Sequence, residues 1–381
     1  MGPGNDDGDQ VPVFADRARG PYLWDVDGNR YVDFVLAFGA VVLGHADPGV
    51  TAAVERELGR GVSPSLHRPV QVELAELLVS VIPGAEMALL LKTGSDATAA
   101  AVRLARAYTG RPHVLRWGYN GWHEWCAPRP AGLSPGIRDY VDHIGYNDLP
   151  ALERALSRHD GAVACVIMMP FEVELPRPGF LEAARGLTHH HGALFAFDEV
   201  RSGFRLALGG AQEHFGVRAD LVALSKAMAN GHPISAVVGR RDVLEAARLV
   251  SLSSLYFRSG DGMAAALATI RAIRDGNVIE VLWERGRQLM AGLRHAAGRQ
   301  GVPAEPLGLP PMPFQRFRYA STRQREAAQR VFYAEARARG ALFHPTHHWF
   351  TCAAMSRDDV ALAVDAAEAA YAAVARSVGT G

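Results

Sequence analysis

The stretch "DLVALSKAMANGHPISAVVG", residues 220–239, contains two apolar runs separated by a segment of small and flexible residues. Each run has the length and composition of a buried strand. Lys226 ends the first run, and a buried strand end is a costly place for an ammonium group unless its charge is paired or neutralised. The stretch therefore predicts two strands with a special role for the lysine between them.

Strand and helix patterns alternate over the residues that precede this stretch. Strand patterns occur in "MALLLK" (87–92), "HVLRW" (113–117), "AVACVIMM" (162–169) and "ALFAFDEV" (193–200), and helix patterns over 96–110, 149–159 and 179–192. Strands separated by helices are typical of an α/β fold. The alternation predicts a large domain with a mostly parallel sheet flanked by helices.

The two ends of the chain have a different character. "YLWDVDGNRYVDF" (22–34) indicates a hairpin around Asp27-Gly28, and long helices dominate from about residue 263. Ser356 and Asp359 form a capping-box pattern at the start of the last helix. We expect both ends to build a smaller α+β domain. The expected boundaries are 1–47 and 263–381 for the small domain and 48–262 for the large domain.

The composition excludes several classes of protein. Forty basic residues balance forty acidic residues, so neither nucleic acid nor an anionic membrane is expected as a partner. Three widely spaced cysteines give no disulfide framework or zinc pattern, which favours the cytoplasm. The polar, acidic N-terminus is not a signal peptide, and we expect it to be frayed. The "HHH" at 189–191 is expected to be a helix end, and no metal site is predicted.

Three strand ends carry unusual chemistry. Lys226 ends one strand, Asp198-Glu199 ends another, and "KTGSDA" (92–97) is a turn that opens a helix, where backbone N–H groups favour an anion such as phosphate. Alone, each has an ordinary explanation: a surface lysine, a solvated loop and a helix cap. Together, an amine, a buried carboxylate and a phosphate cradle are what pyridoxal 5′-phosphate (PLP) requires. About 100 residues separate cradle and carboxylate, and 28 separate carboxylate and lysine.

These motifs also resemble a known family. "LWDVDGNRYVDF", "LGHADPGV", "YNGWHEW", "FAFDEVRSGFR", "LSKAMANGHPISAVVG" and "GALFHP" make the chain similar to class III aminotransferases of PLP fold type I, in the branch that includes glutamate-1-semialdehyde aminomutase. The resemblance implies that Lys226 is the Schiff-base lysine and that Asp198 holds the pyridine nitrogen. It also implies cofactor contacts from Gly94, Ser95, Asp96, Tyr119, Asn120, Val200 and Ser254. It further implies a homodimer with shared active sites.

Four departures from the family pattern limit what can be carried over. "TGSDA" replaces "SGTEA", and Asn120 replaces a histidine; both changes keep hydrogen-bonding capacity. Leu255 falls where the family's threonine reaches the phosphate of the neighbouring subunit, so Ser254, Arg258 or Ser259 could serve instead. The segment "HPTHHWF" (344–350) lacks the aminomutase's substrate-facing glutamate, which argues against isomerisation of glutamate-1-semialdehyde.

The leading functional hypothesis is a transaminase that moves an amino group from an amino-acid donor to a carbonyl acceptor by a ping-pong mechanism. A hydroxylated, sugar-like or other natural-product acceptor is the expected class. Substrate contacts are expected from Phe38, Trp122, His123, Arg201, Arg258, His347, His348 and Trp349, with Arg205 as a further candidate for a carboxylate. The alternatives are an aminomutase, an epimerase or racemase, and a PLP-binding protein without turnover.

Overall fold

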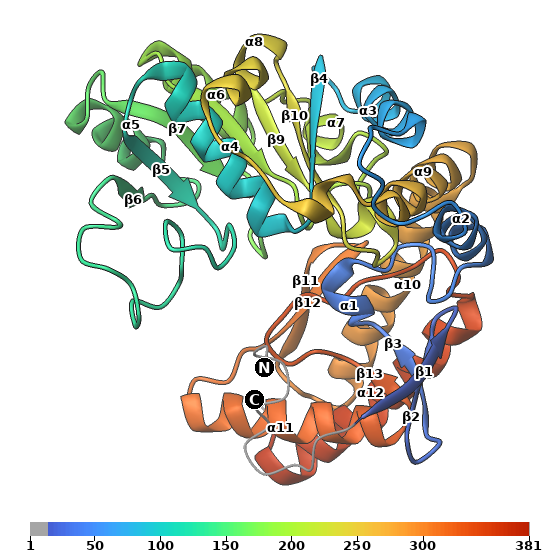
Figure 1. The fold of residues 1–381 in the computed structure, drawn as a ribbon. Coiled ribbons are helices and arrows are strands. Elements are labelled where there is room, and N and C mark those ends of the chain that lie inside the picture. Colours follow the sequence, from blue (N-terminus) through green and yellow to red (C-terminus); the bar gives the residue numbers. More distant parts are fainter. Residues whose placement is uncertain (1–13, 381) are drawn as a thin grey trace. The chain divides into compact units, whose positions relative to one another are not determined.

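The computed structural model describes residues 14–380, so the N-terminal tail expected to be frayed lies outside the described residues. The chain divides into two compact units (Figure 1). The larger unit runs from Gly49 to Asp275, and the smaller unit comprises the chain up to Pro48 and from Gly276 onward. The division after Asp275 assigns the helix over 260–275 to the larger unit, whereas the sequence-based boundary falls at 262.

A seven-stranded sheet with the order β4-β10-β9-β8-β7-β5-β6 forms the centre of the larger unit. Its strands are β4 (Met87–Leu91), β5 (His113–Trp117), β6 (Val141–His143), β7 (Val163–Met168), β8 (Leu194–Asp198), β9 (Leu221–Leu224) and β10 (Ser235–Gly239). Strands β5 to β9 are mutually parallel. The predicted α/β fold with a mostly parallel sheet is confirmed.

Strand β10 is the exception, because it pairs antiparallel with both β9 and β4. The reason lies in the short link between β9 and β10, since a parallel pair needs a crossover of a dozen or more residues. The link begins with the short 3₁₀ turn η1 (Lys226–Ala229) and reverses direction at Asn230 and Gly231, both with positive φ. The "AMANGHP" segment therefore determines the direction of the next strand.

Besides the sheet, the larger unit consists mainly of helices (Figure 1). They are α2 (Pro48–Leu58), α3 (Pro69–Val81), α4 (Gly94–Thr109), α5 (Leu149–Arg158), α6 (Phe180–His190), α7 (Gly210–Phe215), α8 (Arg241–Leu244) and α9 (Gly260–Asp275), with 3₁₀ turns η2 (Glu245–Leu249) and η3 (Leu255–Arg258). Helix α4 packs across β7, β9 and β10 through Ala97, Ala100, Ala101, Leu104 and Ala105. Mostly small side chains let its backbone lie close to the sheet.

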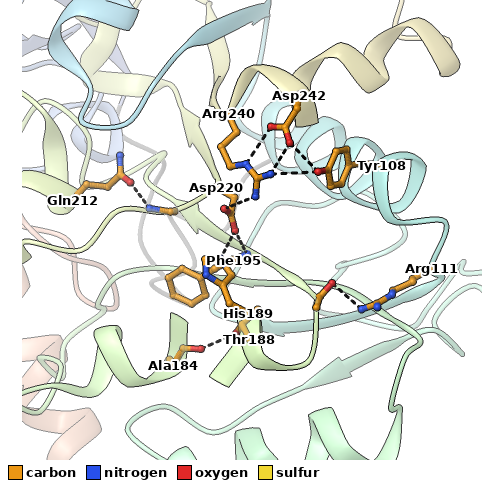
Figure 2. A network of polar contacts seen from close by, with 12 residues as sticks. Tyr108, Arg111, Ala184, Thr188, His189, Phe195, Gln212, Asp220, Arg240 and Asp242 are labelled. Atoms are coloured by element: carbon orange, nitrogen blue, oxygen red, sulfur yellow. Dashed lines mark hydrogen bonds and ion pairs between the residues drawn. The ribbon is translucent and has the colours of Figure 1, made fainter. Parts of the chain in front are cut away.

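At the edge where the parallel strands begin, Asp220 organises a polar network (Figure 2). Its carboxylate accepts hydrogen bonds from His189 Nε2 at 2.7 Å, the Phe195 amide at 2.8 Å and Arg240 Nη1 at 3.2 Å. Arg240 also pairs with Asp242 and donates to the Tyr108 hydroxyl. The network joins the ends of α6, β10 and α4 to the starts of β8 and β9.

The smaller unit contains a four-stranded sheet, a hairpin and helices. The elements are β1 (Ala15–Arg19), β2 (Tyr22–Asp25), β3 (Arg30–Asp33), α1 (Leu36–Gly39), α10 (Val278–Arg299), β11 (Ala304–Leu309), β12 (Met312–Phe317), α11 (Thr322–Ala338), β13 (Ala341–Leu342) and α12 (Arg357–Val378). The predicted hairpin over 22–34 is present as β2 and β3. Ser356 and Asp359 form the predicted capping box of α12.

Candidate active site

Lys226 and Asp198 lie at the carboxyl ends of neighbouring strands, β9 and β8. Although Lys226 retains some accessible surface, its amine is desolvated, and desolvation lowers the pKa of this lysine to about 8. The positive charge of Arg201 lowers it further, whereas Asp198 opposes the shift. A substantial fraction of the amine is therefore neutral near physiological pH, the form that attacks a carbonyl.

The backbone at Lys226 is also unusual. Its φ of +48° lies in the left-handed region, which costs a non-glycine residue roughly 1 kcal/mol or more. Such strain persists where the surrounding structure fixes the residue, and it is frequent at active sites. The sharp turn after β9 thus fixes the position of the lysine at the sheet edge.

The carboxylate of Asp198 is buried but only lightly hydrogen-bonded. Oδ2 accepts from Asn120 Nδ2 at 3.0 Å, and Oδ1 accepts from the Val200 amide at 3.2 Å. Burial raises the pKa of Asp198, and these hydrogen bonds together with the charges of Lys226 and Arg201 oppose the rise. The carboxylate has remaining acceptor capacity and would be stabilised as an anion by a bound cationic group.

Asn120 is held by several groups. The Thr98 hydroxyl donates to its carbonyl oxygen at 2.6 Å, and Arg116 Nη1 donates to its side-chain Oδ1 at 3.2 Å. These contacts turn the Asn120 amide nitrogen toward Asp198. The residue that replaces the family's histidine therefore orients the aspartate, and Thr98 and Arg116 are supporting residues that the sequence analysis missed. The sequence does contain a signal for Thr98: it lies one helical turn after Ser95, so the two side chains share a face of α4.

The turn that opens α4 has the features of an anion cradle. Thr93 and Asp96 form a capping box, which uses the Thr93 and Asp96 amides. The Gly94 and Ser95 amides at the helix start have no acceptor among the described residues. A Cβ on Gly94 would lie 2.6 Å from Val200 Cγ1, so glycine is needed for Val200 to pack here. The site thus brings together Gly94 and Val200, as the resemblance implies.

The loop after β5 approaches the same turn. A Cβ on Gly121 would lie 2.6 Å from Ser95 Oγ, and the Trp122 amide donates to Ser95 Oγ at 3.3 Å. The side chains of Tyr119 and Trp122 are 58% and 69% exposed. Ser95 therefore connects the turn at the start of α4 to the loop that carries the exposed Tyr119 and Trp122.

Arg201 and Glu199 are buried beside Asp198. Arg201 Nη2 donates to the Phe171 carbonyl at 3.2 Å, and its Nη1 lies 4.0 Å from Glu172 Oε1. Glu199 accepts from the Ala211 and Gln212 amides at 2.6 and 3.0 Å, and burial raises its pKa to about 7. Glu199, whose role the sequence did not reveal, fixes the loop that follows β8.

The other candidates lie on different parts of the chain. Ser254 and Arg258 are exposed on and beside η3. Phe38, His347, His348 and Trp349 belong to the smaller unit. There, Phe38 contacts the His347 ring edge-on at 5.0 Å, and Trp349 is fully buried with Nε1 donating to the His344 carbonyl. His348 is also buried, which leaves His347 as the partly exposed member of the three.

The residues of the larger unit fit PLP. A desolvated amine, a buried carboxylate with spare acceptor capacity and a glycine turn with free amides match an aldehyde, a pyridine nitrogen and a phosphate. Within residues 14–380, no group of three or more His, Cys, Asp or Glu side chains could hold a metal ion. The described part also contains no helix long and apolar enough to cross a membrane. Fold and site define a PLP-dependent enzyme of fold type I.

The comparisons with known proteins identify the family. The sequence matches the class-III aminotransferase family over residues 4–123 and 139–347, and the chain belongs to this family. It is 37% identical to the 3-aminobutyryl-CoA aminotransferase of Cloacimonas acidaminovorans (strain Evry), over 94% of this chain and 88% of that protein. It is 41% identical to a glutamate-1-semialdehyde 2,1-aminomutase of Syntrophobacter fumaroxidans, over 77% and 72% of the two chains.

A solved structure gives the same result. The PLP-bound FumI protein of Sphingopyxis sp. MTA144 superimposes with a TM-score of 0.92 at 34% identity, covering 95% of this chain and 89% of that chain. The chain described in this structure is therefore a PLP-dependent class III aminotransferase. When bound, PLP supplies an electron sink for the bonding electrons of a substrate Cα–H bond. The groups of this chain that would hold PLP are the amine of Lys226, the carboxylate of Asp198 and the turn at 94–95.

Proposed function

We propose that the enzyme transfers an amino group from an amino-acid donor to the carbonyl of a small, hydroxylated acceptor, in two half-reactions with ping-pong kinetics. The observation that carries the proposal is the position of Lys226 and the buried Asp198 at the carboxyl ends of the paired strands β9 and β8, where desolvation lowers the pKa of the lysine. A neutral amine can take a proton from substrate and return it to a different carbon, which transamination requires. We also propose that the enzyme acts in the cytoplasm, on the cysteine argument given above.

Two observations support an acceptor without a carboxylate next to its carbonyl. Arg201, a candidate for binding a carboxylate, is buried and occupied by the Phe171 carbonyl and Glu172. Two relatives are named for amines of this kind: a 3-aminobutyryl-CoA aminotransferase, and an aminopentol aminotransferase of Sphingopyxis macrogoltabida that is 35% identical over 96% of this chain.

An aminomutase is the second candidate, because two relatives at 38% and 41% identity are glutamate-1-semialdehyde aminomutases. The segment 344–350 of this chain contains no glutamate, and in the structure His348 and Trp349 of this segment are buried. An epimerase or racemase, which returns the proton to the same carbon, uses the same residues. Neither of these reactions releases an oxo acid from the donor.

A spectroscopic titration tests the proposal. Purified enzyme loaded with PLP is mixed with single amino-acid donors, and the visible band of the lysine-bound cofactor is recorded. We expect one donor to bleach the band with release of its oxo acid, and Lys226→Ala to lack the band and lose at least about a thousandfold in turnover. Bleaching without oxo acid would favour the aminomutase or epimerase. No band in the wild-type protein would refute the cofactor assignment for this chain.

A homodimer with shared sites is part of the proposal. The turn η3 has no buried residue, and Leu255 and Tyr256 on it are 70% and 60% exposed. In a dimer, the second copy of the chain would cover these exposed side chains. Ser254 or Arg258 of the first copy would then contact the cofactor phosphate bound to the second copy. Size measurement in solution tests this part, and a monomer with full activity would contradict it.

A further inference from the structure

Lys92 shares two properties with the catalytic lysine. The chain has forty lysine and arginine residues, and Lys92 and Lys226 are its only lysines. Strand β4 is parallel to β9, because both pair antiparallel with β10. Lys92 follows the last residue of β4 and Lys226 follows β9 after Ser225, so both lie at the same edge of the sheet. Lysine in place of the arginine used elsewhere suggests a specific contact.

The contact is a short chain of hydrogen bonds to the segment after η2. Lys92 Nζ donates to Ser259 Oγ at 2.5 Å, and the Ser259 hydroxyl donates to the Tyr256 carbonyl at 2.9 Å. Ser259 is only 3% exposed. A single buried hydroxyl suits a compact ammonium better than the planar fork of arginine, which needs several acceptors.

Contacts of Gly260, the residue after Ser259, hold the same end of the segment in place. The Gly260 amide donates to the Val62 carbonyl at 3.0 Å, and a Cβ on Gly260 would lie 2.6 Å from Glu57 Oε1. Desolvation lowers the pKa of Lys92, and the nearby Asp261 opposes this shift. The end of the segment is therefore firmly held, while its residues 253–256 are all exposed.

We propose that Lys92 is a positioning residue for cofactor binding: through Ser259 it holds the segment 254–258, so that this segment completes the phosphate site of a second copy of the chain. The inference rests on the cofactor and the dimer of the proposed function. What it adds is Lys92 as the residue that holds segment 254–258 in place. Although Lys92 directly precedes the turn at 93–96 of its own subunit, the contact that it positions is with the phosphate bound to the other subunit.

A double-mutant cycle tests the pathway. Lys92→Met, Ser259→Ala and the double variant are loaded with PLP, and the rate of cofactor release and the phosphorus NMR signal of the bound phosphate are measured. We expect about tenfold faster release and a shifted phosphorus signal in each single variant, with no further change in the double variant. The matched control is Arg271→Met on α9, which removes an exposed ion pair with Glu73 on α3 and should release PLP at the wild-type rate.

Several results would overturn the inference. Unchanged release in Ser259→Ala, or additive effects in the double variant, would mean that Lys92 does not act through the serine. Retention of PLP at the wild-type rate by both single variants would mean that the contact has no role in cofactor binding. These results differ from a failure of the proposed function, in which the wild-type protein itself would not bind PLP through Lys226.

Mixed dimers test which subunit is served. In a dimer of one Lys226→Ala subunit and one Lys92→Met subunit, the intact lysine site belongs to the Lys92→Met subunit, and its partner supplies an undisturbed segment. We expect this site to release PLP at the wild-type rate. Fast release, as in the Lys92→Met homodimer, would show that the segment serves its own subunit and would refute the inference.

Discussion

The two edges of the central sheet each bury an aspartate, and the two aspartates are treated in opposite ways. Asp220, at the edge where the parallel strands begin, accepts hydrogen bonds from His189, Phe195 and Arg240 (Figure 2). Asp198, at the other edge, accepts one hydrogen bond from Asn120 and one from the Val200 amide. Burial raises the pKa of Asp198 in spite of these partners.

The difference distinguishes a carboxylate that is satisfied within the chain from one to which the proposed function gives a role. Asp220 is compensated by a guanidinium, an imidazole and an amide within the chain, so it joins elements and needs nothing else. Asp198 is left with acceptor capacity and a destabilised charge, which a protonated pyridine nitrogen would compensate. Removing each carboxylate should therefore damage a different property.

The largest effect is expected from Asp198→Asn. The amide keeps the shape of the side chain but cannot hold a ring nitrogen protonated, so turnover should fall roughly a hundred- to a thousandfold. Steady-state kinetics with the donor identified by the titration measure the loss. The melting temperature should stay unchanged or rise, because a desolvated carboxylate is removed. Turnover within a few fold of wild type would contradict the role assigned to Asp198.

Asp220→Asn should show the reverse pattern. The change removes the buried charge that faces Arg240 and His189. Because both of these partners are partly exposed, we expect a loss of roughly 1.5–3 kcal/mol of unfolding free energy. Denaturant unfolding measures the loss, while kcat per folded molecule should stay near wild type. Asp242→Asn is the control, since the exposed Asp242 pair with Arg240 should contribute at most about 1 kcal/mol. Equal losses in both variants would show that the network is not centred on Asp220.

The same comparison shows what the sequence could predict. Lys226, Asp198 and the 93–96 turn could be found because each follows an apolar run, and the carboxyl ends of parallel strands meet at one edge of a sheet. The Asp220 network could not be found, since its partners come from α4, α6, β8 and α8, and their meeting depends on the packing of these elements. The antiparallel direction of β10 depends on the length of the link from β9.

Less of the smaller unit could be predicted from the sequence. The hairpin and the capping box of α12 are local patterns, and both are present. Burial in the 344–350 segment was not predictable, because a loop of histidine and tryptophan carries no period that indicates which side chains face inward. Trp349 stacks on Phe343 with ring centroids 4.1 Å apart, a contact that depends on β13 and its neighbours.

The pH dependence of cofactor loading sharpens the comparison. In the proposed function the neutral amine of Lys226 would attack the PLP aldehyde. The loading rate of the PLP-free enzyme should then rise about tenfold per pH unit and level off above about pH 8, the pKa to which desolvation lowers Lys226. An ordinary lysine, with a pKa of 10.5, would show no plateau there. Stopped-flow absorbance at a fixed PLP concentration measures the midpoint.

The lowered pKa of Lys226 also predicts how folding stability depends on pH and how two substitutions change the loading midpoint. Between about pH 8 and 10.5 the unfolded chain binds more protons at this lysine than the folded chain, so folding should become more favourable as the pH rises through this window. Asp198 raises the pKa of Lys226, so Asp198→Asn should move the loading midpoint to lower pH. Asp220→Asn should leave it in place, because Asp220 lies at the opposite edge of the sheet. A midpoint that moved equally in both variants would mean that the two edges are not electrostatically distinct.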